Sequence, residues 1–334
     1  TLAGYDPARP RGGRASGCMA GRGGLLMGVK EILEFVKVEH TLFSLPFVLI
    51  GYVLAHAEFG SGSLDLIWIL LAAVGARGLA MVLNRIIDSD IDAENPRTAS
   101  RHLPSGLMSK QTAWGLAVAF LVILASSAWM LNEVALQMVW LPVLAFMIYP
   151  YTKRVSWICH LWLGLCLGLA PAGAWVALAA DVHGWGAITG VNGGFLWYPE
   201  IFFISMGVAL WIAGFDVNYA RMDVNVDREQ GIKSFPSAYG DRATTGMSVA
   251  LTMGWALCFV LTGLNEATDG RDGYSLWIPA AVLMALVNII VMTKGAQTSM
   301  DSDEAMGGFQ KTLFNASMLT GWALLGSLAL AGVM

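Results

Sequence analysis

The sequence contains few charged residues. Asp, Glu, Lys and Arg make up only 13% of its 334 residues, whereas 56% are hydrophobic. A soluble globular domain carries about 25% charged residues, so this composition excludes an ordinary soluble fold. Glycine is frequent at 38 residues, and tryptophan reaches 13. Because glycine permits close packing of helices in lipid and tryptophan gathers at the headgroup interface, the composition indicates an integral membrane protein.

Cysteine is also scarce, and its four copies show no paired spacing. Cys159, Cys166 and Cys258 lie within apolar runs. We therefore expect neither a disulfide nor a cysteine metal site, and we interpret these side chains as small core residues.

Residues 1–26 differ in composition from the rest of the chain. They are rich in Arg, Gly and Ala and lack the long apolar core of a signal peptide. Met27 then begins a stretch that is typical of a helix start. We expect residues 1–26 to form a disordered extension without a function of its own, and residues 27–334 to form a single transmembrane domain.

Nine apolar runs are long enough to cross a bilayer core of about 30 Å, which needs roughly 20 mostly apolar residues. They lie near residues 42–57, 66–87, 112–131, 134–149, 157–180, 201–222, 244–264, 276–292 and 313–334. The sequence therefore predicts an all-α polytopic membrane protein with about nine transmembrane helices.

Lysine and arginine predict the orientation of these spans. They gather before the first span and in the loops that follow the second, fourth, sixth and eighth spans. The other loops contain one basic residue between them, Arg271. By the positive-inside rule, we expect a multi-pass protein of the cell membrane with its basic loops in the cytoplasm.

Two of the basic loops, four spans apart, begin with carboxylates at helical spacing. The two sets are Asn84, Asp88 and Asp92, and then Asp216, Asp223 and Asp227. At about 100° per residue, each set shares one face of a continuous helix, whereas Asp90 points elsewhere.

These arrays have the composition of a metal site. Solvated helix ends that pair with arginines would explain a single Asp, but not two repeated arrays in phase. Ionisable residues at a membrane boundary usually face a cavity, and stacked like charges repel one another unless a cation neutralises them. Carboxylate and amide oxygens form a donor set that Mg²⁺ prefers, with substrate phosphates completing the shell.

Basic residues accompany the arrays. Arg97 and Arg101 follow the first array, Lys153 and Arg154 follow the fourth span, and Lys233 follows the second array. Guanidinium and ammonium groups suit phosphate oxygens. A metal and cations beside an apolar helical pocket indicate a site for a diphosphate carried on a lipid.

Four motifs occur in order along the chain. They are Asn-x-x-x-Asp-x-x-x-Asp from Asn84, Asn-Pro-Arg-Thr from Asn95, Tyr-x-x-x-Lys-Arg from Tyr149, and Asp-x-x-Tyr-x-x-x-Asp-x-x-x-Asp from Asp216. Together they resemble the UbiA superfamily of intramembrane prenyltransferases, over most of the chain from about Val38 onward. The stretch 39–47 also resembles the first-helix signature of 4-hydroxybenzoate polyprenyltransferases.

The resemblance implies nine helices around a central cavity with a cytoplasmic cap. It implies Mg²⁺ bridging the diphosphate of a polyprenyl donor, whose prenyl group is transferred to a small aromatic acceptor such as 4-hydroxybenzoate. The bilayer is then a partner, and we expect no nucleic-acid partner. The predicted metal ligands are Asn84, Asp88, Asp92, Asp216, Asp223 and Asp227. The predicted catalytic residues are the same five aspartates with Lys153, and the predicted diphosphate-binding residues are Arg97, Arg101, Lys153, Arg154 and Lys233.

Arg77 lies inside the second span, seven residues before Asn84, on the same helical face and about 10 Å deeper. A buried arginine can pair with the carboxylate of an acidic acceptor, and an interhelical salt bridge is the alternative explanation. We predict that Arg77, Tyr149 and Tyr219 bind the acceptor.

Other functions and acceptors stay open at this point. A secondary transporter would place its ionisable residues near the membrane midplane, but here all except Arg77 cluster at one end of the spans. Among prenyltransferases, geranylgeranylglyceryl phosphate, haem and naphthoate are alternative acceptors.

Overall fold

The structure is a computed structural model that describes residues 28–37, 41–190, 199–268, 274–297 and 302–332. All regular elements in these ranges are helices, and nine helical segments are long and apolar enough to cross a membrane. This confirms the predicted all-α fold with about nine spans. The extension predicted at residues 1–26 lies outside the described residues.

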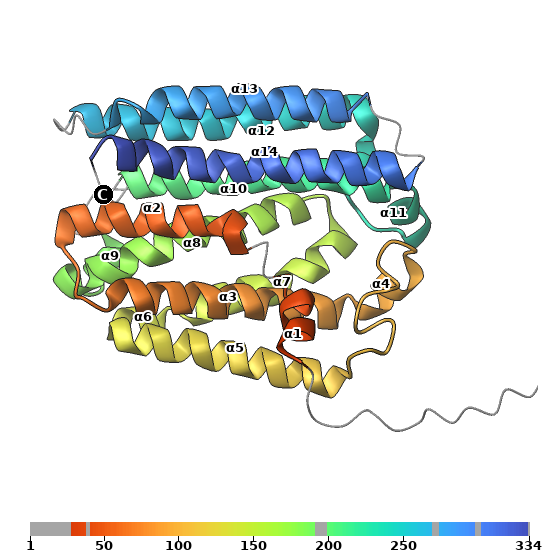
Figure 1. Cartoon of the computed structure of the whole chain (residues 1–334), viewed down its shortest axis with the longest axis horizontal. Helices are drawn as coiled ribbons and strands as arrows, with labels where there is room; N and C mark the ends of the chain where they lie inside the picture. Colours follow the sequence, from red (N-terminus) through yellow and green to blue (C-terminus); the bar gives the residue numbers. More distant parts are fainter. Residues whose placement is uncertain (1–27, 38–40, 191–198, 269–273, 298–301, 333–334) are drawn as a thin grey trace, which may run out of the picture.

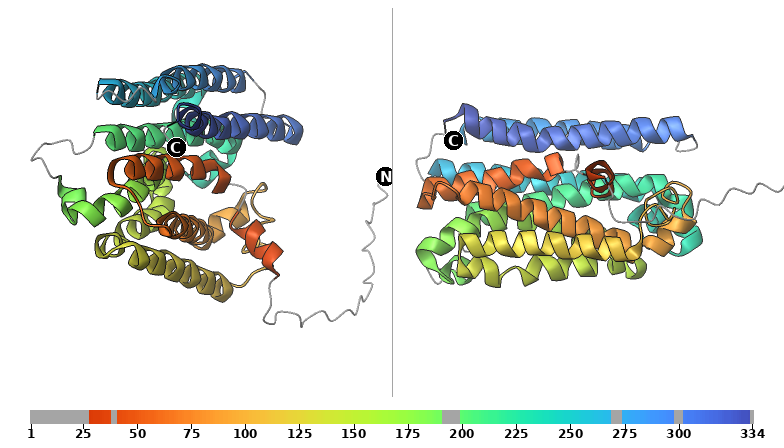
Figure 2. Two further views of the ribbon diagram at one scale, coloured as in Figure 1. Left: turned by 60° about the vertical axis from the view of Figure 1, so that its left-hand side comes forward. Right: turned by 60° about the horizontal axis from the view of Figure 1, so that its bottom comes forward.

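The spanning helices run roughly parallel to one another (Figure 1). In chain order they are α2 (Thr41–Phe59), α3 (Asp65–Ile87), α5 (Lys110–Leu131), α6 (Glu133–Gln137) with α7 (Trp140–Val155), α8 (Cys159–His183), α10 (Pro199–Tyr219), α12 (Phe235–Thr268), α13 (Trp277–Gly295) and α14 (Asp303–Leu330). The short elements are α1 (Val29–Phe35), α4 (Ser89–Glu94), α9 (Gly186–Thr189), the 3₁₀ helix η2 (Ala220–Asp223) and α11 (Val224–Gln230). Helices α4 and α11 lie at the same end of the bundle, opposite the carboxyl terminus (Figures 1 and 2). We call this the motif end.

Three predicted spans differ from the observed helices. Helices α12 and α14 begin at Phe235 and Asp303, about ten residues before the apolar runs, because hydropathy detects only the part of a helix that lies in lipid. The fourth span is divided between α6 and α7. Pro142 lies in the first turn of α7, where the missing N–H of proline costs no helical hydrogen bond.

Aromatic side chains fill the core on one side of the bundle. Trp211 of α10, Trp255 of α12 and Trp277 of α13 are all completely buried and belong to one apolar cluster. Phe43 of α2 stacks on Trp211 with ring centroids 4.7 Å apart. These contacts join the first span to spans that are more than 150 residues away in the sequence.

Glycine allows α8 to approach its neighbours closely. A Cβ atom at Gly164 of α8 would lie 2.1 Å from the carbonyl oxygen of Ala209 on α10, and one at Gly51 of α2 would lie 2.3 Å from that of Pro171 on α8. Such contacts require a backbone without a side chain, which is the usual means of close helix packing in membranes.

Gly164→Ala should therefore destabilise the protein. The added methyl group must push α8 away from α10, at a cost of about 1–3 kcal/mol in the free energy of unfolding. Thermal unfolding in detergent measures the change as a lower Tm. Gly115→Ala on α5 is the control, because nothing lies within 4 Å of its added Cβ. The same Tm for both variants would contradict the close contact.

Candidate active site

The first carboxylate array lies where α3 passes into α4. Asp88 is the residue between the two helices and is only 2% exposed. Its Oδ2 accepts hydrogen bonds from Lys153 Nζ at 2.6 Å and from Asn84 Nδ2 at 2.9 Å. Arg154 lies on the other side of this carboxylate, with Nη2 3.6 Å from Oδ1. Two basic residues of α7 therefore neutralise Asp88.

The helix is interrupted at Asp88, which has φ −92° and ψ 2°. The helical register nevertheless continues, because the N–H of Asp92 donates to the carbonyl oxygen of Asp88 at 2.8 Å. Asp92 is buried, and both its carboxylate oxygens accept from Arg101 Nη1 at 2.8 Å. The side chain of Asp90 is 91% exposed and lies 3.5 Å from Lys110. The predicted difference in orientation between Asp90 and Asp92 is thus present.

The second array spans three elements. Asp216 lies in the last turns of α10, Asp223 ends η2, and Asp227 lies in α11. The expectation of one regular helical face is wrong here, because a 3₁₀ turn advances about 120° per residue instead of 100°. The three carboxylates consequently have different partners.

Each carboxylate of the second array forms its own hydrogen bonds. Asp216 accepts from His160, and Asp227 accepts from the hydroxyl of Ser234. Asp223 is held by a two-pronged ion pair with Arg97, in which Nε lies 2.9 Å from Oδ1, and by Asn95 Nδ2 at 3.2 Å.

The Arg97–Asp223 pair joins the two arrays directly. Arg97 belongs to the loop after α4, yet its partner lies 126 residues further along the chain. The guanidinium also lies over the ring of Tyr219, 5.5 Å from its centroid. The hydroxyl of Tyr219 accepts from Gln310 Nε2 of α14 at 3.0 Å. The motif end is therefore connected by polar contacts among the loop after α4, α10, η2 and α14.

Four of the five predicted diphosphate-binding residues are paired with predicted metal ligands. The residues are Arg97, Arg101, Lys153 and Arg154. Lys233 differs from them, since its side chain is exposed and forms no ion pair with any described residue. Its backbone N–H donates to the carbonyl oxygen of Lys153 at 2.8 Å.

The donor chemistry at the motif end fits a divalent metal, although the arrangement of side chains is not that of a formed metal site. No group of three His, Cys, Asp or Glu side chains within the described ranges is close enough to hold an ion. Asp88 Oδ1, however, is buried without a hydrogen-bond partner. Burial raises the pKa of Asp88 above its ordinary value, and the ion pair with Lys153 opposes this rise. A buried, under-satisfied carboxylate oxygen is costly, and a bound cation removes that cost.

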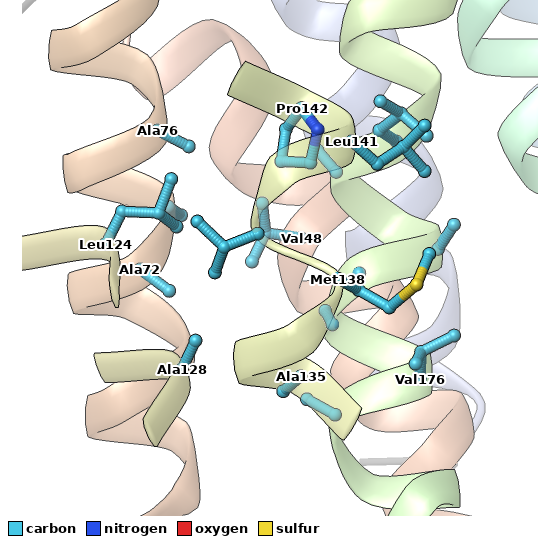
Figure 3. Close-up of a pocket in the computed structure, with 18 of the residues that line it drawn as sticks. Val48, Ala72, Ala76, Leu124, Ala128, Ala135, Met138, Leu141, Pro142 and Val176 are labelled. Atoms are coloured by element: carbon cyan, nitrogen blue, oxygen red, sulfur yellow. The ribbon is translucent and has the colours of Figure 1, made fainter. Parts of the chain in front are cut away.

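An apolar cavity of about 380 Å³ lies among α2, α3, α5, α6, α7 and α8. Its walls are mostly alanine and larger aliphatic side chains, including Ala76, Leu124 and Met138 (Figure 3). The break between α6 and α7 lines it as well. Non-helical backbone at membrane depth is tolerated where it lines a cavity.

Arg77 is the one charged side chain among the described residues that line this cavity. It forms no ion pair with any residue of the described ranges, so the interhelical salt bridge considered from the sequence is not observed there. Along α7, Tyr149 lies between Phe146, which lines the cavity, and Lys153, which pairs with Asp88. Tyr149 therefore lies between the cavity and the first array.

A sequence profile of the UbiA prenyltransferase family matches residues 44–306. The chain belongs to this family. It is thus a prenyltransferase and a multi-pass membrane protein, as the resemblance of its motifs implied.

Named relatives and solved structures agree with this assignment. A polyprenyl transferase of Arthrinium sp, atnF, is 30% identical over 70% of this chain and 68% of its own length. A 4-hydroxybenzoate octaprenyltransferase of Vibrio cholerae is 29% identical over 59% of this chain and 75% of its own. A UbiA homologue from Aeropyrum pernix, 30% identical, superposes with a TM-score of 0.70 over 89% of this chain and 99% of that one. A homologue from Archaeoglobus fulgidus, bound to GPP and Mg²⁺, gives 0.61 at 16% identity over 89% and 99%.

Several polar residues of this UbiA family prenyltransferase were missed by sequence reasoning. The missed residues that contact the arrays are Asn95, His160 and Ser234. Arg85 of α3 is only 6% exposed and lies within electrostatic reach of Asp92. Asn95 was visible in the Asn-Pro-Arg-Thr motif, but His160 lies in an otherwise apolar run and has no spacing that marks it.

Substitutions at Asp88 and Asp90 should separate position from acidity. Asp88→Asn removes a buried charge beside Lys153 and should lower kcat for prenyl transfer by at least about 100-fold, the scale of one electrostatic contact in an active site. Asp90→Asn should lower kcat by less than about tenfold, because Asp90 faces solvent. The two variants are compared at equal abundance in membranes and at saturating Mg²⁺. An Asp90→Asn enzyme as inactive as Asp88→Asn would contradict the geometry.

Proposed function

We propose that the protein catalyses Mg²⁺-dependent transfer of a polyprenyl group from polyprenyl diphosphate to an aromatic acceptor that carries a carboxylate, such as 4-hydroxybenzoate. One observation carries the proposal. Helices α3 and α7 carry carboxylates and cations at the motif end, and deeper in the bundle they line an apolar cavity whose guanidinium, that of Arg77, has no ion-pair partner among the described residues. The relative named 4-hydroxybenzoate octaprenyltransferase and the homologue bound to GPP and Mg²⁺ support it.

The diphosphate is bound by Arg97, Arg101, Lys153 and Arg154, with Lys233 as an exposed addition. The metal ligands are Asn84, Asp88, Asp92, Asp216, Asp223 and Asp227. Bound Mg²⁺ supplies positive charge beside the diphosphate, which gains negative charge as it leaves. The cations of the protein contribute in the same way, because they are fixed near the same oxygens.

Ligand binding requires an exchange of partners at the motif end. A carboxylate that held Mg²⁺ would leave its arginine or lysine, and the released cation would then be free to pair with a phosphate oxygen. Because both halves of the exchange break the same ion pairs, metal and diphosphate bind cooperatively.

The apolar cavity holds the prenyl chain. The allylic C–O bond breaks, diphosphate leaves with the bonding electron pair, and the allylic cation is attacked by a ring carbon of the acceptor. A new C–C bond forms, and the ring then loses the proton from that carbon. Walls of alanine, leucine and methionine exclude water, which would otherwise trap the cation as an alcohol.

Arg77 binds the carboxylate of the acceptor at the side of the cavity, with Tyr149 and Tyr219 nearer to the arrays. An unpaired guanidinium in an apolar cavity is expensive, and a planar carboxylate is its natural two-pronged partner. This favours hydroxybenzoate or naphthoate acceptors, in which the carboxylate is attached directly to the small ring that is alkylated. The positive-inside distribution of Lys and Arg supports a cytoplasmic location for the motif end.

Incubation of the purified protein with a polyprenyl diphosphate and a panel of acceptors tests the proposal. The panel contains 4-hydroxybenzoate, a dihydroxynaphthoate, geranylgeranylglyceryl phosphate and haem, and mass spectrometry detects the products. We expect C-prenylated products from 4-hydroxybenzoate or the dihydroxynaphthoate only, and none in excess EDTA. Transfer at the full rate in EDTA would rule out the metal, and prenylation of only the glyceryl phosphate or haem would rule out the acceptor class.

Arg77→Ala should raise KM for 4-hydroxybenzoate about 10–100-fold, the effect of losing a hydrogen-bonded charge. KM for the prenyl diphosphate should change far less, because Arg77 lies in the cavity and not among the cations of the motif end. Phenol, which lacks the carboxylate, is the matched control acceptor. It should react equally well with the wild type and with Arg77→Ala. Equal effects on both substrates, or a lower Tm, would favour a structural role for Arg77.

A further inference from the structure

His160 is a buried histidine that connects three elements of the motif end. It lies in the first turn of α8 and is 3% exposed. Its Nδ1 is 2.7 Å from Oδ2 of Asp216 on α10. Its Nε2 accepts the backbone N–H of Phe235, the first residue of α12, at 3.0 Å. Both ring nitrogens are therefore engaged with groups from different helices.

The Phe235 contact determines the tautomer of the ring. A backbone N–H only donates, so Nε2 must present its lone pair to it. The proton consequently lies on Nδ1, and Nδ1–H donates to Asp216. The hydrogen bond of one nitrogen sets the role of the other, as in the carboxylate–histidine pairs that orient metal ligands.

The segment Ile232–Phe235 contacts the other parts of the site. The N–H of Ile232 donates to the carbonyl oxygen of Asp227 at 2.8 Å, and the hydroxyl of Ser234 donates to the Asp227 carboxylate. The N–H of Lys233 donates to the carbonyl oxygen of Lys153 at 2.8 Å. His160 adds Asp216 to this set. One short segment thus connects two carboxylates of the second array with Lys153, which neutralises a carboxylate of the first array.

We propose that His160 is a positioning residue that holds the carboxylate of Asp216 in place for metal binding through its Nδ1–H, while Nε2 ties the ring to the start of α12. The inference rests on the proposed function, because it takes Asp216 as a metal ligand. The side chain of Asp216 is 20% exposed although its Oδ2 is engaged, so the carboxylate is still accessible to a ligand. His160 does not line the apolar cavity, and it acts on the reaction only through Asp216.

Two substitutions at position 160 separate the hydrogen bonds from the volume of the ring. His160→Gln supplies an N–H donor and a carbonyl acceptor on one side chain, so it can satisfy Asp216 and the N–H of Phe235 together. His160→Leu has a similar size but supplies neither. If His160 only fills space, His160→Leu should behave like the wild type. If its role depends on proton transfer or charge, both variants should be impaired.

The readout is metal affinity, measured separately from turnover. Mn²⁺ binding to the full chain in detergent is followed by electron paramagnetic resonance in the presence of inorganic pyrophosphate. We expect His160→Leu to weaken Mn²⁺ binding about 10–100-fold, the usual effect of removing a group that orients a metal ligand. His160→Gln should remain within about threefold of the wild type. In the Asp216→Asn background, His160→Leu should have no further effect, since the residue acts through Asp216.

The outcomes distinguish this inference from the proposed function. If the wild type binds no Mn²⁺ with pyrophosphate, the proposed function fails before His160 is considered. If the wild type binds Mn²⁺ and His160→Leu binds it equally well, or His160→Gln is as weak as His160→Leu, the positioning role is overturned and the proposed function stands. Should His160→Leu lower Tm too far for the measurement, His160→Gln decides alone. Retention within about threefold then supports the role, and a tenfold or greater loss overturns it.

Discussion

The neutralisation of buried carboxylates at the membrane boundary is the constraint on which the motif end depends. Asp88, Asp92 and Asp227 are each less than a tenth exposed, and an isolated charge in such a place costs several kcal/mol. Every one of them has a donor from another segment of the chain. The need to supply those donors brings α7, the loop after α4 and the residue before α12 against the end of α3, α4 and α11, respectively.

The same pairing would prepare the motif end for the ligands proposed above. Cations and carboxylates that neutralise one another are held close together, so a metal ion and a diphosphate can take over existing charges without new ones being buried. Arg77 is the exception, because its guanidinium lies in an apolar cavity away from any carboxylate of the described residues. A buried charge without a partner destabilises the fold, so its presence is better explained by ligand binding than by a contribution to stability.

The bundle is closely packed on one side and contains a cavity on the other. Helix α8 approaches α2 and α10 through glycines, and completely buried tryptophans fill the space among α10, α12 and α13. On the other side, small alanines on α3 and α5 face the divided fourth span, and the cavity lies between them (Figure 3). The difference in side-chain volume between the two sides thus decides where the cavity lies, which is the place proposed above for the prenyl chain.

The number of spans, the end that carries the charges and the members of both arrays follow from the sequence, because hydropathy and helical spacing are local properties. Even the opposite orientation of Asp90 and Asp92 follows, since the register persists through Asp88. The second array was predicted less well, because η2 interrupts the helix between Asp216 and Asp227 and no local signal marks that turn. Partners such as Arg97 for Asp223 and His160 for Asp216 lie 126 and 56 residues apart. Only the packing of whole helices sets such distances, so the tertiary structure alone decided which cation or histidine holds each carboxylate.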